Sequence, residues 1–224
     1  MKRLTIAIDG PAGAGKSTIA RGVAEELGYT YIDTGAMYRS AAWYCLQRGV
    51  LPENHEECTQ LTMGMRIRFE TDGENGQRVY ADEKDVTLAI RSPEVTRLSS
   101  PISAIPAVRR ALVAIQQNMG ANGGVVMEGR DIGTVVFPDA EVKVFLTASE
   151  EERARRRWLE CTARGENTTQ EEILYAQRER DMRDSSRADS PLAAAHDAVN
   201  ICTDDMTIEQ VLTAILDLCR ERGA

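Results

Sequence analysis

The sequence has little of what zinc sites, disulfide frameworks and membrane spans require. It contains two histidines, and its five cysteines are widely separated and form no CxxC pair. This spacing argues against a zinc site or a disulfide framework and favours reduced thiols. No run of about 18 apolar residues occurs, so we expect no membrane span. The start of the chain lacks the features of a signal peptide, and we expect a cytoplasmic protein.

The composition is that of an ordinary globular protein. The 224 residues are 42% hydrophobic and 28% charged, which predicts one compact domain with room for a small inserted lobe. The net charge of -8 disfavours binding to nucleic acid through a broad basic face. Arginines nevertheless concentrate at 153–157 and 178–187. Local arginine clusters in an acidic chain suit a small anionic ligand held in a cleft.

Apolar strands alternate with helical patterns along most of the chain. Strands are predicted at 4–9, 29–32, 124–128, 142–146 and 198–202. Helices are predicted at 16–27, with Gly28 as the C-cap, and at 33–48, 105–118, 150–163, 169–185 and 207–222. This alternation predicts βαβ units and an α/β fold with a parallel sheet.

The segment 51–103 has a different pattern. Residues 65–70 alternate between apolar and polar side chains, 72–77 read as a turn, and 78–81 resume a strand pattern. Alternation of this kind is typical of antiparallel strands. We therefore expect a small antiparallel insert.

The first strand is followed by the pattern GxxxxGK[ST] of a phosphate-binding P-loop. Its glycines, Gly10, Gly13 and Gly15, let backbone N–H groups point at phosphate oxygens, and the next helix adds its positive end. Lys16 can reach the β- and γ-phosphates, and the Ser17 hydroxyl can ligate Mg²⁺. The sequence therefore predicts a protein that binds and cleaves a nucleoside triphosphate.

A P-loop alone does not separate a kinase from a GTPase switch or a motor. The sequence has no NKxD-like guanine reader and no long apolar strand ending in paired acids. The short, arginine-rich chain favours a small-molecule kinase, because acceptor phosphate and migrating phosphoryl group both need positive charge. Two alternatives are a uridylate, adenylate or shikimate-type kinase and a nucleotide-dependent switch without catalysis.

Four stretches carry a family resemblance: 8–18, 33–39, 129–140 with the sequence GRDIGTVVFPDA, and 178–187. Through them the chain resembles the bacterial-type cytidylate kinases of the P-loop nucleoside-monophosphate kinase superfamily. The resemblance implies a three-layer fold with a central five-stranded parallel sheet. It also implies a core of residues 1–50 and 104–224, an enlarged nucleoside-monophosphate-binding insert at 51–103 and a short helical lid at about 157–168. The implied activity is transfer of the γ-phosphoryl group of MgATP to CMP and dCMP.

The resemblance also implies residue roles. ATP would be bound by Gly10, Pro11, Ala12, Gly13, Ala14, Gly15, Lys16, Ser17, Thr18 and Arg157, with Ser17 also a magnesium ligand. CMP would be bound by Thr34, Gly35, Tyr38, Arg39, Ser100, Arg109, Arg130, Asp131, Arg180, Asp184 and Arg187. The catalytic residues would be Lys16, Arg130 and Arg180.

The chemistry of these residues suits the implied roles. Thr34 is a candidate N-cap for the helix that carries Arg39, so this helix start can receive a phosphate. Asp131 would accept from the cytosine amino group, where uracil presents an acceptor, with help from Arg109 and Ser100. Asp33 could be an outer-shell magnesium anchor.

Other interpretations stay open on the residues alone. Arg39 could be a solvated charge on a helix, and Arg130 and Asp131 could form a surface ion pair. Positions 180, 183, 184 and 187 could form a solvated salt-bridged face. Water could replace Ser17 in the magnesium shell. The substrates implied are small molecules, with no nucleic acid or membrane partner, and a monomer is the default.

Overall fold

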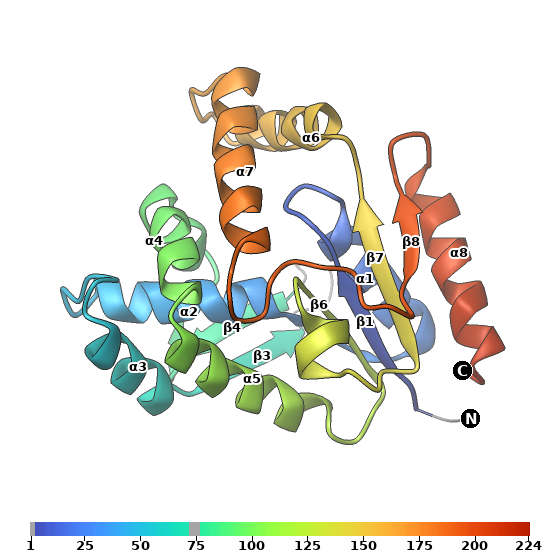
Figure 1. The fold of residues 1–224 in the computed structure, drawn as a ribbon, viewed down its shortest axis with the longest axis horizontal. Coiled ribbons are helices and arrows are strands. Elements are labelled where there is room, and N and C mark those ends of the chain that lie inside the picture. Colours follow the sequence, from blue (N-terminus) through green and yellow to red (C-terminus); the bar gives the residue numbers. More distant parts are fainter. Residues whose placement is uncertain (1–2, 72–76) are drawn as a thin grey trace. The chain divides into compact units, whose positions relative to one another are not determined.

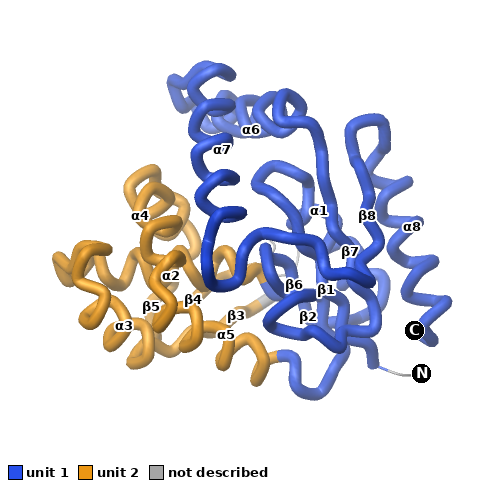
Figure 2. The backbone as a smooth tube through the Cα atoms, in the orientation of Figure 1, with its two compact units in different colours: residues 1–32, 120–224 blue, residues 33–119 orange. Residues whose placement is uncertain are grey.

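A computed structural model of the chain describes residues 3–71 and 77–224. The chain divides into two compact units, unit 1 with residues 1–32 and 120–224 and unit 2 with residues 33–119 (Figure 2). The predicted insert at 51–103 lies inside unit 2, whose bounds are wider. They are wider because the helix at 34–46 packs on the helix at 93–103. Figure 1 labels the helices and strands.

A five-stranded sheet forms the centre of unit 1. Its strands are β1 (Thr5–Asp9), β2 (Thr30–Asp33), β6 (Val125–Gly129), β7 (Val142–Thr147) and β8 (Val199–Cys202). They lie in the order β2-β6-β1-β7-β8, and β1 pairs in parallel with both β6 and β7. In this register Asp9 at the end of β1 lies opposite Gly129 at the end of β6. The predicted α/β fold with a five-stranded parallel sheet is confirmed.

The helices of unit 1 are α1 (Lys16–Leu27), α6 (Glu150–Ala163), α7 (Gln170–Ser185) and α8 (Ile208–Glu221). Buried apolar side chains of α1 and α8, such as Ile19 and Ile215, share one cluster with Ile8 and Leu146 of the sheet. Within each helix the buried side chains recur at steps of three and four residues and therefore lie on one face. Gly28 ends α1 in the left-handed conformation with φ 63°, as predicted. A five-residue π-helical turn, η3 (Ile132–Val136), follows β6.

Unit 2 combines helices with a small antiparallel sheet. It contains α2 (Thr34–Leu46), α3 (His55–Gly64), β3 (Ile67–Thr71), β4 (Gln77–Ala81), β5 (Lys84–Asp85), η2 (Ala89–Arg91), α4 (Pro93–Ser103) and most of α5 (Pro106–Gly120). The strands pair antiparallel in the order β3-β4-β5, as the alternating pattern predicts. Of the turn predicted at 72–77, residues 72–76 lie outside the described residues.

Five elements of the described residues were not predicted: α3, β5, η2, α4 and η3. The N-terminus of α4 has ordinary helix-start chemistry, since the Ser92 hydroxyl accepts from the N–H of Val95 at 3.3 Å and Pro93 is the first helical residue. In the described ranges no single helix is long and apolar enough to cross a membrane. Among the described residues one pair of helices, α4 and α5, is long and apolar enough when taken together, but the pair is bent by 98°.

Candidate active site

The P-loop joins β1 to α1 and passes close to its neighbours. Gly10 has φ 144°, and a Cβ there would lie 2.0 Å from the carbonyl oxygen of Leu146. Gly13 has φ 80°, and a Cβ there would lie 3.0 Å from the Cβ of Arg153. Only glycine fits these two positions. Gly15 precedes α1 without a side-chain cap, so the helix start keeps N–H groups for an anion.

Lys16, the first residue of α1, is a buried cation. Its Nζ donates to the carbonyl oxygen of Pro11 at 2.7 Å. Burial lowers its pKa from 10.5 to about 7, and the nearby charges of Arg130 and Arg180 act in the same direction. Glu128 and Asp9 oppose this shift only in part. Lys16 therefore lies where a bound anion would stabilise its charge.

Two buried carboxylates lie at the carboxyl ends of β1 and β6. Asp9 accepts from the N–H groups of Ile132 at 2.9 Å and Gly133 at 2.8 Å. Burial raises the pKa of Asp9 to about 6, although these two hydrogen bonds oppose the shift. Glu128 accepts from the Tyr31 hydroxyl. Neither acid was among the predicted site residues, but Asp9 is the last residue of β1 and Glu128 the last but one of β6, at the edge where open α/β sheets bind ligands.

Three arginines surround one carboxylate in unit 1. Asp184 of α7 is 1% exposed, and Arg130 donates to it through Nε at 3.2 Å. Arg180 lies 3.8 Å away, and Arg187 donates to the other carboxylate oxygen. This Asp184 cluster gathers three guanidinium groups around one buried carboxylate, and such a concentration of positive charge suits an anionic ligand. The structure therefore brings together Arg130 and the predicted residues of 180–187, which are about 50 positions apart in the chain.

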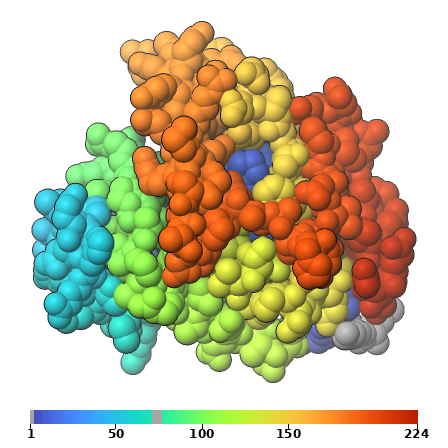
Figure 3. All heavy atoms as spheres, viewed as in Figure 1, coloured from blue at the N-terminus to red at the C-terminus, as the bar shows by residue number. Residues whose placement is uncertain are grey.

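The arginine of α6 that contacts the P-loop is Arg153. Its Nη1 donates to the carbonyl oxygen of Ala12 at 3.1 Å and to Asp181 of α7 at 2.6 Å. Figure 3 shows N-terminal atoms (blue) in an opening bordered by yellow and orange atoms of the later part of unit 1. Arg157, the predicted lid arginine, is more exposed and pairs with Glu160 of the same helix at 2.9 Å. Sequence reasoning missed Arg153, although it lies one helical turn before Arg157.

In unit 2 the start of α2 holds an acid–arginine pair. The N-cap is Asp33, whose Oδ1 accepts from the N–H of Ala36 at 2.9 Å. This corrects the prediction of Thr34 as the cap, since Thr34 is already the first helical residue. The other oxygen of Asp33 accepts from Nη2 of Arg39 at 2.8 Å. Burial alone would raise the pKa of Asp33, but Arg39 and the Ala36 N–H outweigh it and lower the pKa.

The Asp33–Arg39 pair leaves one polar atom unused. Nε of Arg39 is buried and has no hydrogen-bond partner among residues 3–71 and 77–224. A Cβ on Gly35 would lie 3.0 Å from both Nη1 of Arg39 and Oδ1 of Asp33, so a larger residue would disturb the pair. A donor left unsatisfied in a buried position is costly, and an acceptor such as a phosphate oxygen would satisfy it.

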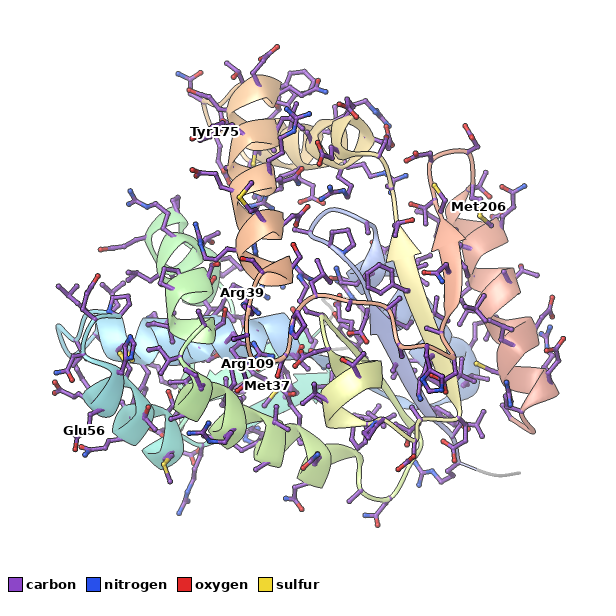
Figure 4. All side chains as sticks on the ribbon, viewed as in Figure 1. Met37, Arg39, Glu56, Arg109, Tyr175 and Met206 are labelled. Atoms are coloured by element: carbon purple, nitrogen blue, oxygen red, sulfur yellow. The ribbon has the colours of Figure 1, made fainter. Side chains whose placement is uncertain are left out.

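A second arginine of unit 2, Arg109 of α5, is 2% exposed. Its Nη1 donates to the carbonyl oxygen of Ser103 at 3.1 Å, and its guanidinium carbon lies 5.2 Å from the centre of the Tyr38 ring. Ser100 is also buried, in α4. Figure 4 labels Arg109 and Arg39, which come from α5 and α2. The contact of Arg109 with Tyr38 places two predicted CMP residues together.

A model of the cytidylate kinase family matches residues 6–221. The chain belongs to the cytidylate kinase family. It is 50% identical over 219 residues to a cytidylate kinase of Citrifermentans bemidjiense, covering 98% of this chain and 94% of the relative. The predictions of family and of a cytidylate kinase activity are confirmed.

A bifunctional pantoate ligase/cytidylate kinase of a Synechococcus strain is also 50% identical, over 222 residues. The match covers 98% of this chain but only 41% of that relative, so the chain spans about two fifths of the bifunctional protein. Among solved structures, an uncharacterized protein from Eubacterium ventriosum has a TM-score of 0.52 at 13% identity, covering 98% of this chain and 99% of its own. That likeness concerns the fold alone.

The residues expected for a cytidylate kinase fall in both units. Unit 1 contains the P-loop, the Asp184 cluster and Asp131, which is 3% exposed. Unit 2 contains Thr34, Gly35, Tyr38, Arg39, Ser100 and Arg109. Burial of Asp131 and Arg109 argues against their being solvated surface charges. The role of each residue toward a nucleotide stays a prediction.

Proposed function

We propose that the chain transfers the γ-phosphoryl group of MgATP to the 5′-phosphate of CMP or dCMP, giving CDP or dCDP and ADP. The observation that carries the proposal is the P-loop with its buried Lys16, in a chain of the cytidylate kinase family. Relatives that match nearly the whole chain carry the name cytidylate kinase.

ATP would be bound in unit 1. The N–H groups of the P-loop and of the first turn of α1 would cradle its β- and γ-phosphates. Lys16, whose pKa is lowered to about 7 by burial, would regain its charge beside these phosphates. Arg157 would meet the triphosphate if α6 and its following loop close over the nucleotide.

Magnesium would be bound mainly through the nucleotide. Mg²⁺ prefers oxygen ligands and is usually held by one or two protein groups together with substrate phosphates. Ser17 fits this requirement, because it is a half-buried residue with a hydroxyl group in the first turn of α1, next to Lys16. When bound, the ion would neutralise charge on the β- and γ-phosphate oxygens.

CMP would be recognised by charge at its phosphate and by hydrogen bonds at its base. Arg39, with an unused buried Nε, would donate to the 5′-phosphate. Asp131 would accept from the cytosine amino group, and Arg109 would donate to the ring acceptors. Asp184 and Arg187 would hold the ribose and its phosphate. A 2′-hydroxyl contact would decide the preference between CMP and dCMP.

Transfer would proceed by direct in-line displacement. The attacking 5′-phosphate oxygen of CMP is already anionic, so the reaction needs no strong general base. Positioning and charge neutralisation therefore supply most of the rate acceleration. Lys16, Arg130 and Arg180 would stabilise the charge that spreads over the migrating phosphoryl group.

Kinetics with a panel of acceptors test the proposal. We expect CDP formation from CMP and ATP, slower turnover with UMP and AMP, and none with shikimate. Asp131→Ala should lower the preference for CMP over UMP by about 10- to 100-fold, since a hydrogen bond to a charged group contributes about 1.5–3 kcal/mol. Asp139→Ala, at an exposed acid of the same segment, is the matched control. An unchanged preference in Asp131→Ala would refute the assignment of the base reader.

Two outcomes would favour other functions. Tight ATP binding without CDP formation would indicate a nucleotide-dependent switch, and faster turnover with another acceptor would indicate a different small-molecule kinase. A cytoplasmic monomer without nucleic acid or membrane partners stays a prediction. Size-exclusion chromatography with light scattering tests the oligomeric state.

A further inference from the structure

We infer that Asp9 is a positioning residue for nucleotide selection, because its carboxylate holds the backbone turn that carries Arg130 and Asp131. The inference rests on the proposed function, in which these two residues meet CMP. It concerns an acid of β1 that the proposed mechanism leaves without a role.

The contact between Asp9 and the turn uses both oxygens of the carboxylate. Oδ1 accepts from the N–H of Ile132 at 2.9 Å, and Oδ2 accepts from the N–H of Gly133 at 2.8 Å. Asp9 is 4% exposed, and Ile132 is fully buried. Paired hydrogen bonds from buried N–H groups to an ionised acceptor are among the stronger contacts in a protein. The backbone at 132–133 is therefore fixed to the end of β1.

These two N–H groups belong to the start of η3, where a helix normally depends on its own N-cap residue. Here the N-cap position is Asp131, yet its side chain makes no cap hydrogen bond. Asp9, which lies 123 positions earlier in the chain, supplies the cap instead. Asp9 thus fixes the backbone from which the Asp131 carboxylate projects.

The position of Asp9 also connects this turn to the P-loop. Asp9 is the last residue of β1, lies opposite Gly129 in the sheet, and directly precedes Gly10. One carboxylate therefore joins the start of the loop expected to bind ATP to the turn expected to read the base. Burial makes this carboxylate costly, and the charge of Asp131 adds to that cost, while Lys16 of α1 offsets part of it.

Asp9→Asn tests the inference, with Asp205→Asn at an exposed acid of unit 1 as the matched control. The amide keeps one acceptor and turns an N–H group toward the second backbone N–H, so the turn loses one hydrogen bond. We expect the ratio of kcat/KM for CMP over UMP to fall by about tenfold, a change equal to about 1.4 kcal/mol or one hydrogen bond. The dissociation constant of ATP should stay at the wild-type value. A merely structural role would lower Tm and leave the CMP/UMP ratio unchanged, and that result would overturn the inference.

A double-mutant cycle distinguishes action through Asp131 from a general effect. If Asp9 acts by placing Asp131, Asp9→Asn should not lower the CMP/UMP ratio further in an Asp131→Ala background. Additive losses would overturn the inference. Failure of the proposed function is a separate result, because the wild-type chain would then form no CDP.

Wild-type kinetics provide a second measurement if Asp9→Asn does not fold. Protonation of Asp9 removes one of its two acceptor sites, so the CMP/UMP ratio should fall as the pH drops through about 6, the pKa to which burial raises this group. Both acceptors carry the same 5′-phosphate, so its titration cancels in the ratio. Among nearby charges, Asp131 raises the pKa of Asp9 and Lys16 lowers it. A ratio that is constant from pH 7.5 to pH 5.5 would contradict the inference.

Discussion

Replacing Lys16 by methionine should abolish phosphoryl transfer and, at the same time, stabilise the nucleotide-free protein. Lys16 is 6% exposed, and its Nζ donates a hydrogen bond to the carbonyl oxygen of Pro11. Methionine has an unbranched apolar chain that can occupy the space of the lysine stem. The substitution therefore removes a buried charge at the cost of one hydrogen bond, about 1 kcal/mol.

The size of the stabilisation follows from the pKa of Lys16. Burial, with Arg130 and Arg180, lowers this pKa from 10.5 to about 7 in the folded protein. Between these two values the unfolded chain holds a proton that the folded chain has released, so the free energy of unfolding rises with pH. Below pH 7 the folded protein carries the full penalty of the charged lysine. That penalty is about 5 kcal/mol from the difference between the two pKa values.

Chemical denaturation of both proteins at several pH values measures this effect. At pH 6 Lys16→Met should unfold at a higher denaturant concentration than the wild type. Its advantage in the free energy of unfolding should shrink by about 2 kcal/mol by pH 8.5, because Lys16 loses its proton over this interval. Groups that do not interact with Lys16 titrate alike in both proteins and cancel, whereas the pKa of Asp9 should rise further when the charge of Lys16 is removed. An advantage that does not change with pH would refute the lowered pKa, and undiminished turnover would refute the role of Lys16 in transfer.

Two further predictions concern backbone and cap positions. Gly10→Ala should abolish ATP binding, since its Cβ would lie 2.0 Å from the carbonyl oxygen of Leu146. Gly64→Ala is the control: its Cβ would have open space around it, and the substitution should stabilise α3 by up to about 1 kcal/mol. Equal effects of both variants on ATP affinity, measured by calorimetry, would contradict this. Asp33→Ala should lower the free energy of unfolding by about 1 kcal/mol through the lost cap and raise KM for CMP, because Arg39 loses its partner. An unchanged Tm in thermal unfolding would show that Asp33 is not an effective cap.

The parts of the structure that were predicted correctly depend on local signals. The apolar strand 5–9, the glycine loop and the helix 16–27 each follow from adjacent residues, and the helix bounds match the structure. The same holds for α6, where Ser149 supplies the cap. In such segments the local propensity, the apolar pattern and the capping residues all favour the observed structure, so they can be predicted from the sequence.

The parts of the structure that were not predicted depend on competing local signals or on contacts between residues far apart in the sequence. In 51–103 the alternating pattern indicates strands, whereas the segment also contains α3 and α4. Pro101 inside α4 argues against a helix, although the helix continues through it. Asp33 and Thr34 are adjacent residues with similar capping ability, and the ion pair with Arg39 gives Asp33 a second contact at the cap. Asp9 and Arg153 act on residues more than 100 positions away, which no local pattern records.

Burial shifts the pKa values of two groups beside the P-loop so that the uncharged form of each is favoured. Lys16 falls to about 7 and Asp9 rises to about 6, so each is held in a charged form only with help from its neighbours. The Asp184 cluster adds three guanidinium groups to a single carboxylate in the same unit. A protein selected for stability alone would gain by replacing these groups with apolar ones. Their retention at the carboxyl ends of the strands is explained if a polyanionic substrate completes the charge balance, because ATP would then stabilise the site that the empty protein holds at a cost.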